Sequence, residues 1–147
     1  MNSDQVDLKK FEELTKSELY AILALRLQVF CVEQNCPYQD IDNEDQTALH
    51  VFLKDKNTIK AYARIIKENK KKYHIGRVVV NEKYRKDGLA TAIINKCIES
   101  INHNKNATIE ISAQSYLKDF YTKFGFINTG HYYLEDNIPH ERMQLTA

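Results

Sequence analysis

The chain has no excess of charge of either sign, and this separates it from most nucleic-acid-binding domains. Its 147 residues include 21 lysines and arginines against 20 aspartates and glutamates. Proteins that bind nucleic acid usually carry basic side chains clustered on one face. Here only residues 67–73, KENKKKY, are locally basic, and they fit a solvated turn between two strands. We therefore expect no nucleic-acid partner.

Long apolar runs and metal-ligand spacings are also missing. No segment approaches the roughly 18–20 apolar residues of a membrane-spanning helix, and the polar first ten residues, MNSDQVDLKK, do not resemble a signal peptide. The cysteines Cys31, Cys36 and Cys97 and the five scattered histidines form no pattern such as HExxH. We expect a cytoplasmic protein with reduced thiols, no membrane partner and no metal.

The sequence contains no internal repeat, low-complexity tract or Gly/Ser-rich linker. With 43% hydrophobic residues, the chain is ordinary for a globular protein of one domain. We therefore expect a single domain over residues 1–147.

Apolar periodicity predicts seven strands and three helices in the order β-α-β-β-β-α-β-α-β-β. Strands are expected at residues 6–14, 48–54, 58–68, 73–81, 107–113, 126–136 and 139–145. Helices are expected after residues 15–18 and ending before Pro37, at residues 88–102 and at residues 115–125. This mixture of hairpins and strand–helix–strand crossovers predicts an α/β (mixed α+β) domain with helices packed on a central mixed sheet.

Two of the helices have clear sequence signals. Thr15 and Glu18 form a capping box, in which each side chain satisfies a free backbone amide at the start of the first helix. The apolar face of that helix is expected to be Leu19, Ile22, Leu23, Leu27 and Phe30, and that of the second helix Leu89, Ala92, Ile93, Cys97, Ile98 and Ile101.

The connection VVVNEKYRKDGLATAI, residues 78–93, has the features of an anion site. The first amides of a helix lack intrahelical partners, and the helix dipole adds positive charge there. Gly88 lacks a Cβ, Arg85 and Lys86 add charge, and Ala90 is small. The alternative is a surface turn that is basic by chance. The Walker pattern GxxxxGK[ST] and the GxGxxG fingerprint are both absent.

Two motifs resemble the GNAT superfamily of N-acetyltransferases. RKDGLA (85–90) is similar to its R/Q-x-x-G-x-G/A signature, and QSYLKDFYTKFGF (114–126) is similar to its N-x-x-A-x-x-F-Y-x-x-x-G-F segment. The segments LRLQVFCVEQNCPYQDID (25–42) and EDNIPHERM (135–143) further resemble the ElaA-like group. Gln114 stands where the superfamily usually has Asn, and Leu117 where it has Ala.

The resemblance implies a GNAT-like domain with a mostly antiparallel sheet, whose splayed strands hold coenzyme A. It implies transfer of an acetyl group from acetyl-CoA to a primary amine by direct attack in a ternary complex. The residues expected to bind the donor are Val78, Val79, Val80, Arg85, Lys86, Asp87, Gly88, Leu89, Ala90, Thr91, Gln114 and Tyr121. A carboxylate beside phosphates is unfavourable, so the side chain of Asp87 should point to water.

By position, Tyr121 matches the general acid of the superfamily, since a phenol can protonate a departing thiolate of comparable basicity. The alternative is that FYTKFGF is only an aromatic packing cluster. That reading holds for Phe120, Phe124 and Phe126, whereas Tyr121 has a polar hydroxyl.

The general base and the acceptor are less defined. Glu33, His50 and His140 are the candidates for the base, because an alkyl amine is almost fully protonated at pH 7. The residues expected at the acceptor are Arg26, Glu33, Asp42, Arg64 and Arg77. A structural alternative pairs these carboxylates with the arginines, since a buried charge needs a partner.

The acidic loop at residues 33–45 favours a small amine with a cationic group as the acceptor. Two alternatives stay open. Solvent or the arginines could cancel the field of this loop, or the arginines could themselves bind a carboxylate of the acceptor. Other functions stay open: a non-catalytic acyl-CoA sensor or interaction module, a protein or peptide N-acetyltransferase, and a nucleotide-binding domain. The sequence also leaves a homodimer open.

Overall fold

The computed structural model describes residues 5–146, in which seven strands form one mixed sheet. The strands are β1 (Asp7–Lys10), β2 (Leu49–Asp55), β3 (Thr58–Asn69), β4 (Lys72–Val80), β5 (Thr108–Gln114), β6 (Ile127–Glu135) and β7 (Ile138–Thr146). Their spatial order is β1-β2-β3-β4-β5-β7-β6, and every neighbouring pair is antiparallel except β4 and β5. Parallel neighbours need a crossover connection, which is supplied here by a helix.

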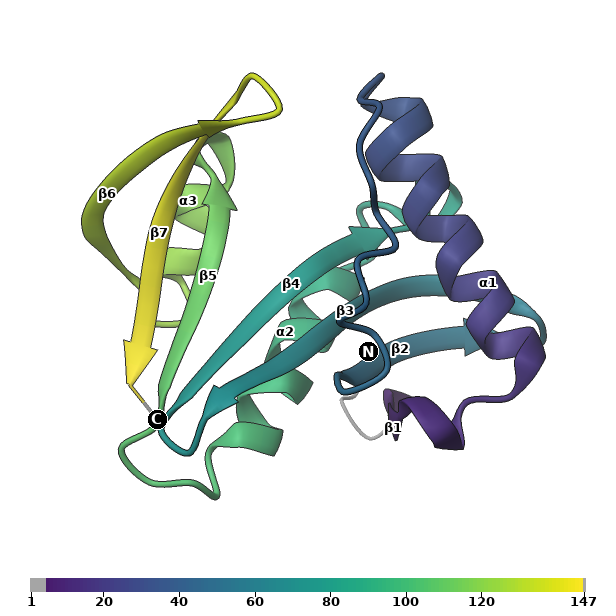
Figure 1. Ribbon diagram of the computed structural model, residues 1–147, viewed down its shortest axis with the longest axis horizontal. Helices are drawn as coiled ribbons and strands as arrows, with labels where there is room; N and C mark the ends of the chain where they lie inside the picture. The colour runs from purple at the N-terminus through teal and green to yellow at the C-terminus, as the bar shows by residue number, and fades with distance from the viewer. Residues whose placement is uncertain (1–4, 147) are drawn as a thin grey trace.

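Three helices pack around this sheet. They are α1 (Lys16–Leu27), which a π-helical segment (Gln28–Glu33) extends, α2 (Leu89–Ile101), which connects β4 to β5, and the short α3 (Lys118–Thr122) after β5. In Figure 1, α1 crosses the front of β2 and β3, while α2 lies behind β3 and β4. Short 3-10 helices occur at Phe11–Glu13, Glu82–Tyr84 and Ser115–Leu117.

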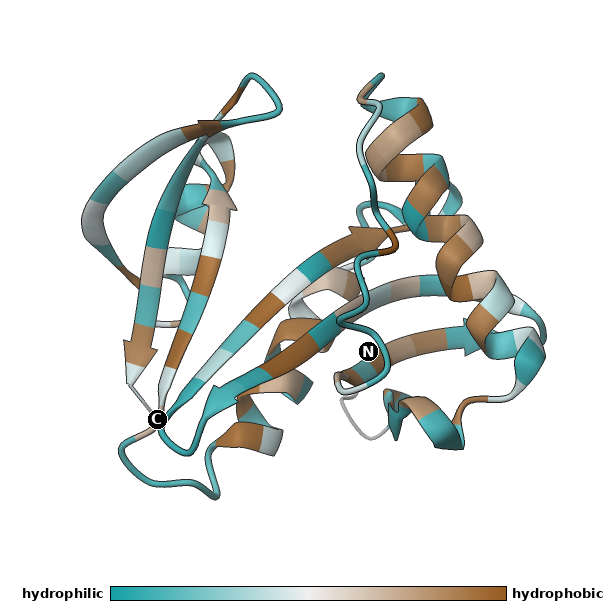
Figure 2. Ribbon diagram, viewed as in Figure 1, coloured by the Kyte–Doolittle hydropathy of each residue, from teal (hydrophilic) through white to brown (hydrophobic). Residues whose placement is uncertain are grey.

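Each face of the sheet has its own hydrophobic cluster. Successive residues of a strand point to opposite faces, so Val51 and Leu53 of β2 join the cluster with α2, while Phe52 between them packs against α1. Ile22 and Leu25 supply the side of α1 in the smaller cluster. Hydrophobic residues accordingly gather along α1 and the middle strands, and the connecting loops are hydrophilic (Figure 2).

The predicted order of elements and the mixed-sheet fold are confirmed, but the first strand is shorter than predicted. β1 ends at Lys10 and a 3-10 helix replaces the rest of the expected strand. The reason is local: the Glu13 carboxylate accepts a hydrogen bond from the Lys10 amide at 2.7 Å and closes a turn.

The capping box at the start of α1 is confirmed. The Glu18 amide donates to Thr15 Oγ1 at 3.0 Å, and the Thr15 amide donates to Glu18 Oε1 at 2.9 Å. The buried Glu18 carboxylate also pairs with Lys9 of β1 and Lys54 of β2, at 3.0 and 2.5 Å. The capping residue therefore ties the helix to two strands.

The predicted apolar face of α1 is rotated relative to the observed one. Ile22 is buried as predicted, but Leu27 is 39% exposed, and the buried stripe continues through Leu25, Arg26 and Val29. Arg26 can lie on the buried side because carboxylates of the following loop neutralise its guanidinium.

Strands β4 and β5 pair only over their first halves. Four register pairs join them, and the last is Ile75 opposite Ile111. β4 nevertheless continues to Val80, and β5 continues to Gln114. The two strands therefore separate toward their carboxyl ends (Figure 1).

A β-bulge in β4 accompanies this separation. Tyr62 of β3 lies opposite Val79 and Arg64 lies opposite Gly76, so β4 has one residue more than β3 in this interval. Arg77, within the bulge, has a φ of 51°. A bulge bends its strand and increases the local twist, so β4 turns away from β5 just after their last register pair.

Candidate active site

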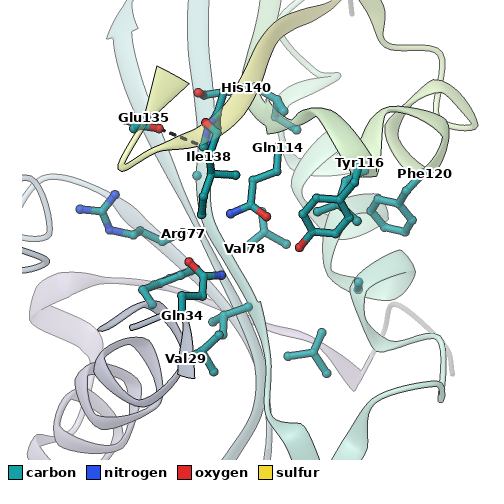
Figure 3. Close-up of a pocket in the computed structure, with 18 of the residues that line it drawn as sticks. Val29, Gln34, Arg77, Val78, Gln114, Tyr116, Phe120, Glu135, Ile138 and His140 are labelled. Atoms are coloured by element: carbon teal, nitrogen blue, oxygen red, sulfur yellow. Dashed lines mark hydrogen bonds and ion pairs between the residues drawn. The ribbon is translucent and has the colours of Figure 1, made fainter. Parts of the chain in front are cut away.

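A cavity of 670 Å³ lies where β4 and β5 separate. Its size is within the usual range of about 300–1,000 Å³ for small-molecule sites. Its walls are the end of β4, the end of β5 with α3, the π-helical segment after α1, and the turn between β6 and β7. In Figure 3, Gln114 and Tyr116 lie on the β5 side, and Val29 and Gln34 lie on the α1 side.

The β4 wall has an edge without a strand partner. Val78, Val79 and Val80 line the cavity, and so does Gln114 of β5. On its other edge β4 pairs with β3, where Val79 is opposite Tyr62. Among residues 5–146, no strand pairs with β4 on the cavity side beyond Ile75. Backbone groups on this edge are therefore free to bond an extended ligand in the way that an added strand would.

The start of α2 is open, in contrast to that of α1. Its N-cap is Gly88 in the left-handed conformation, with a φ of 74°, and no side chain caps the free amides. Lys86 also has a positive φ of 75°. A Cβ on Gly88 would meet nothing within 4 Å, so the backbone conformation rather than space favours glycine here. The helix start has the unsatisfied donors of an anion site.

The predicted donor-binding loop divides into residues that line the cavity and residues that lie beside it. Arg85 and Ala90 line the cavity. The remaining ones, Lys86, Asp87, Gly88, Leu89 and Thr91, do not line it in this structure. Leu89 is a core residue at 3% exposure, so only its backbone could serve a ligand. The Asp87 side chain is exposed, as expected.

Arg85 is paired with Glu33 across the cavity. Arg85 Nη1 lies 2.5 Å from Glu33 Oε1, and Nη2 lies 2.9 Å from Oε2. The hydrogen bonds from Arg85, aided by its charge, lower the pKa of Glu33 below its ordinary value. Glu33 is the last residue of the π-helical segment and lies 52 residues before Arg85 in the sequence.

Tyr121 lies in the cavity wall with its ring packed among aromatic residues. The ring is edge-on to Phe120 and to Phe126, at centroid distances of 5.0 and 6.1 Å, and the residue is 5% exposed. Its hydroxyl is not among the buried side-chain atoms that lack a hydrogen-bond partner within residues 5–146. Burial raises the pKa of Tyr121 well above its usual value near 10, so the phenol stays protonated over the physiological pH range. Packing and a polar role are both compatible with this position.

His140 lines the cavity from β7, where it is the register partner of Gln114. Its Nδ1 lies 2.7 Å from the carbonyl oxygen of Ile138. Because a carbonyl can only accept, Nδ1 carries the hydrogen, and Nε2 of the neutral ring is left as an acceptor. Glu135 Oε2 lies 3.4 Å from Nε2 (Figure 3), where it would stabilise a charged ring.

His50 was a candidate for the base, and the structure places it outside the cavity. It is fully buried, its Nδ1 lies 2.7 Å from the Tyr62 hydroxyl, and its Nε2 lies 2.9 Å from the Asp45 carbonyl oxygen. Burial lowers the pKa of His50. With both ring nitrogens occupied and no cavity contact, His50 lies outside the site that Glu33 and His140 line.

Three predicted acceptor residues belong instead to a buried ion cluster. Arg26, Arg64 and Asp42 do not line the cavity. Arg26 is fully buried, and it bonds Asp40 at 2.9 Å and Asp45 at 2.7 Å. Arg64 bonds Asp42 at 2.6 Å and Asp45 at 3.0 Å, and the first of these bonds lowers the pKa of Asp42 to about 2. The alternative of structural pairing therefore holds for these residues.

Arg77 joins the same cluster and also reaches the cavity. Its Nη2 bonds Asp42 Oδ2 and the Asp40 carbonyl oxygen, both at 3.2 Å. Its Nε lies 2.9 Å from Asp40 Oδ1, although the N–H is not aligned with that oxygen. Three aspartates of the loop thus face three arginines, so the local negative field expected from this loop is largely cancelled.

Several cavity residues were not predicted from the sequence. Gln34 and Tyr38 come from the segment after α1, Tyr116 precedes α3, and Asp136 belongs to the β6–β7 turn. The β6–β7 turn had a signal in the sequence, because the dipeptide Asp136-Asn137 suits a two-residue hairpin turn. In the structure both residues have positive φ, as such a turn requires. That signal predicts a hairpin but not what lies opposite it.

Some kinds of site and segment are absent from the part of the chain that is described. Within residues 5–146, no group of three or more His, Cys, Asp or Glu side chains could hold a metal ion. No described helix is long and apolar enough to cross a membrane. The three cysteines are free, and Cys97 is fully buried in the core, as its place in the apolar pattern predicted.

Comparison with known proteins gives consistent relatives. Protein ElaA of Escherichia coli (strain K12) is 42% identical over 133 residues, which is 87% of each chain, and the crystal structure of E. coli ElaA superposes with a TM-score of 0.88 over 95% of this chain and 97% of that one. A crystal structure described as an acyl-CoA N-acyltransferase from Pseudomonas aeruginosa has 33% identity, a TM-score of 0.88, and the same coverage of 95% and 97%. A UPF0039 protein of Schizosaccharomyces pombe is 38% identical over 140 residues, 93% of each chain.

The resemblance to the ElaA-like group is thereby confirmed, and so is the predicted GNAT-like fold. Residues 12–147 match the acetyltransferase (GNAT) domain family. The chain belongs to the GNAT family of acetyltransferases, with an acyl-CoA N-acyltransferase fold.

Proposed function

We propose that this protein transfers an acetyl group from acetyl-CoA to a primary amine of a small molecule, by direct attack in a ternary complex. One observation carries the proposal: a single cavity joins the unpaired edge of β4, the loop before the uncapped start of α2, and Tyr121. The Pseudomonas aeruginosa relative is described as an acyl-CoA N-acyltransferase, which supports the same class of donor.

The chain's own groups fit the two ends of such a donor. The free backbone edge formed by Val78, Val79 and Val80 can bond the amides of an extended pantetheine arm. The amides from Arg85 to Ala90, together with the Arg85 guanidinium, can bond the pyrophosphate. Acetyl-CoA supplies an acyl group activated as a thioester.

His140 is the group that we assign as the proton acceptor. Its Nε2 is the acceptor atom of the neutral ring, whereas both nitrogens of His50 are occupied. The Glu33 carboxylate is a weaker base than an imidazole, whether or not Arg85 holds it. An amine is nucleophilic only when neutral, and at pH 7 only about one alkyl amine in a thousand is neutral. Glu135 stabilises the imidazolium that proton transfer to His140 creates.

Tyr121 is the group that we assign as the proton donor. As the amine nitrogen bonds to the acyl carbon, the carbon–sulfur bond breaks, the nitrogen gives up one proton to water, and the sulfur takes a proton from the Tyr121 hydroxyl. The phenolate then recovers a proton from water. Burial keeps the hydroxyl protonated before the reaction.

The acceptor that we propose is a small primary amine with a further positive charge. The aspartates of the acidic loop at residues 33–45 no longer support this, because they are paired with arginines. Glu135 and Asp136 of the β6–β7 turn support it instead, since both line the cavity and neither is paired with an arginine or lysine among the described residues.

Acetyl-CoA should bind the purified protein with a Kd in the micromolar range (about 1–100 μM). Isothermal titration calorimetry measures this, and CoA release with a panel of amines, amino acids and peptides measures turnover. Absence of binding by folded protein would exclude the proposed activity. Binding of acetyl-CoA without amine-dependent CoA release would show an acyl-CoA sensor, and turnover on peptides alone would show a peptide acetyltransferase. Competition of ATP with acetyl-CoA that is stronger than their shared phosphates explain would favour a nucleotide site.

Replacing His140 by glutamine should leave acetyl-CoA affinity unchanged and lower kcat at pH 7 by about a hundredfold. The deficit should shrink as the pH approaches 10, because the amine is then largely neutral without a base. The pH dependence of kcat with one amine measures this. His131→Gln is the matched control, since His131 lies on β6 and does not line the cavity. A deficit of constant size at all pH values would contradict the role of base.

A further inference from the structure

The contact between Glu33 and Arg85 joins two different walls of the cavity. Glu33 ends the π-helical segment on the α1 side, and Arg85 belongs to the loop between β4 and α2. Both residues line the cavity, and their bidentate contact has lengths of 2.5 and 2.9 Å. The Arg85 guanidinium, which is expected to bind a phosphate of the donor, is therefore already paired with the Glu33 carboxylate.

A guanidinium has two edges that can hold an anion bidentately, and in Arg85 both are occupied. The Nη1–Nη2 edge holds the Glu33 carboxylate. On the other edge, Nε donates to the Val80 carbonyl oxygen at 3.2 Å. A phosphate can bind Arg85 bidentately only if one of these partners leaves. Val80 is fixed in β4, and its carbonyl is neutral, whereas a carboxylate beside a phosphate is repelled, so Glu33 is the partner that leaves.

Two properties of Glu33 keep the free energy needed to break its contact with Arg85 small. The side chains of Glu33 and Arg85 are 34% and 38% exposed, so water can replace either partner, and pairs of this kind contribute little net stability. The carboxylate is also carried by a π-helical turn, whose wider hydrogen bonding is less stable than that of an α-helix and is frequent at functional sites.

We infer that Glu33 is a displaceable counter-ion of Arg85, which yields its place to the donor's pyrophosphate and then binds the ammonium group of the acceptor. This inference rests on the proposed acetyltransferase function. Before the donor binds, Glu33 holds the guanidinium in position over the end of β4. Once released, its carboxylate is an unpaired negative charge in the cavity wall, which attracts a cationic amine. Donor and acceptor binding are then coupled, and the coupling is reciprocal.

Glu33→Gln tests the first half of the inference by calorimetry, without any need for turnover. The variant should bind acetyl-CoA about three- to fivefold more tightly than the wild type, because no carboxylate competes for Arg85. Arg85→Met should weaken binding by about tenfold, and Glu33→Gln should have no further effect in that background. S-acetylpantetheine, which lacks the pyrophosphate, should bind wild type and Glu33→Gln equally.

Glu82→Gln is the matched control, because Glu82 is a second carboxylate close to Arg85 that makes no hydrogen bond to it. It should leave acetyl-CoA affinity within about twofold of the wild type. Equal or weaker binding of acetyl-CoA by Glu33→Gln would overturn the inference while leaving the proposed function intact. Failure of the wild type to bind acetyl-CoA would overturn both.

The second half of the inference is measured with saturating acetyl-CoA. Glu33→Gln should raise the acceptor KM by about tenfold for a diamine, and by much less for a neutral-tailed monoamine of the same length. An unchanged KM for the diamine would show that the released carboxylate does not bind the acceptor.

Discussion

Replacing Tyr121 by phenylalanine is expected to lower kcat by ten- to a thousandfold while leaving acetyl-CoA affinity and stability nearly unchanged. The ring supplies the packing against Phe120 and Phe126, and phenylalanine keeps it. The change removes one oxygen atom and leaves the aromatic contacts in place. In the proposed mechanism, the variant lacks the proton for the departing sulfur. Single-turnover kinetics measures the chemical step, and thermal unfolding measures stability.

The competing candidate for the acid is Tyr116, whose phenol also points into the cavity (Figure 3). Tyr116 is 74% exposed, so water surrounds its hydroxyl and it is not positioned by packing. Tyr116→Phe should therefore reduce kcat by less than about threefold. A large loss in Tyr116→Phe together with a normal rate in Tyr121→Phe would transfer the role to Tyr116 and leave Tyr121 as packing.

Replacing Arg26 by methionine is expected to destabilise the protein by about 3–5 kcal/mol. The side chain is fully buried, and its guanidinium makes three hydrogen bonds, to both Asp45 and Asp40 side chains and to the Asp40 carbonyl oxygen. Methionine fills the space but leaves buried carboxylates short of a partner. The midpoint of thermal unfolding should fall by about 10 °C.

Two further variants separate charge pairing from loss of volume. Arg142→Met removes an arginine whose side chain is 42% exposed and pairs with Glu110, and it should change stability by less than about 1 kcal/mol. The double variant Arg26→Met/Asp45→Asn should lose less free energy of unfolding than the two single variants lose together, because it removes both charges of one ion pair. Additive costs would show that Arg26 acts through packing alone.

Much of the candidate site could be predicted from the sequence because its motifs are local. The loop at residues 85–90 precedes a helix, and the segment at 114–126 follows a strand, so pattern alone places both next to element ends. Val78, Arg85, Gln114 and Tyr121 accordingly line one cavity. The place of His50 outside the cavity could not be predicted, because its surroundings are Tyr62 and a loop carbonyl, and strand alternation does not show which face of the sheet is covered.

By itself, the sequence determined the order of the elements, the capping box of α1, the uncapped glycine start of α2 and the family resemblance. Each of these depends on residues within a few positions of one another, where backbone sterics and periodicity act directly. Only the tertiary structure decided the separation of β4 from β5, which depends on the register of β3 against β4 and the bulge at Arg77. It also decided the partners of the charged residues, such as Glu33 with Arg85, since ionic contacts follow from the packing of distant segments and carry no periodic signal in the chain.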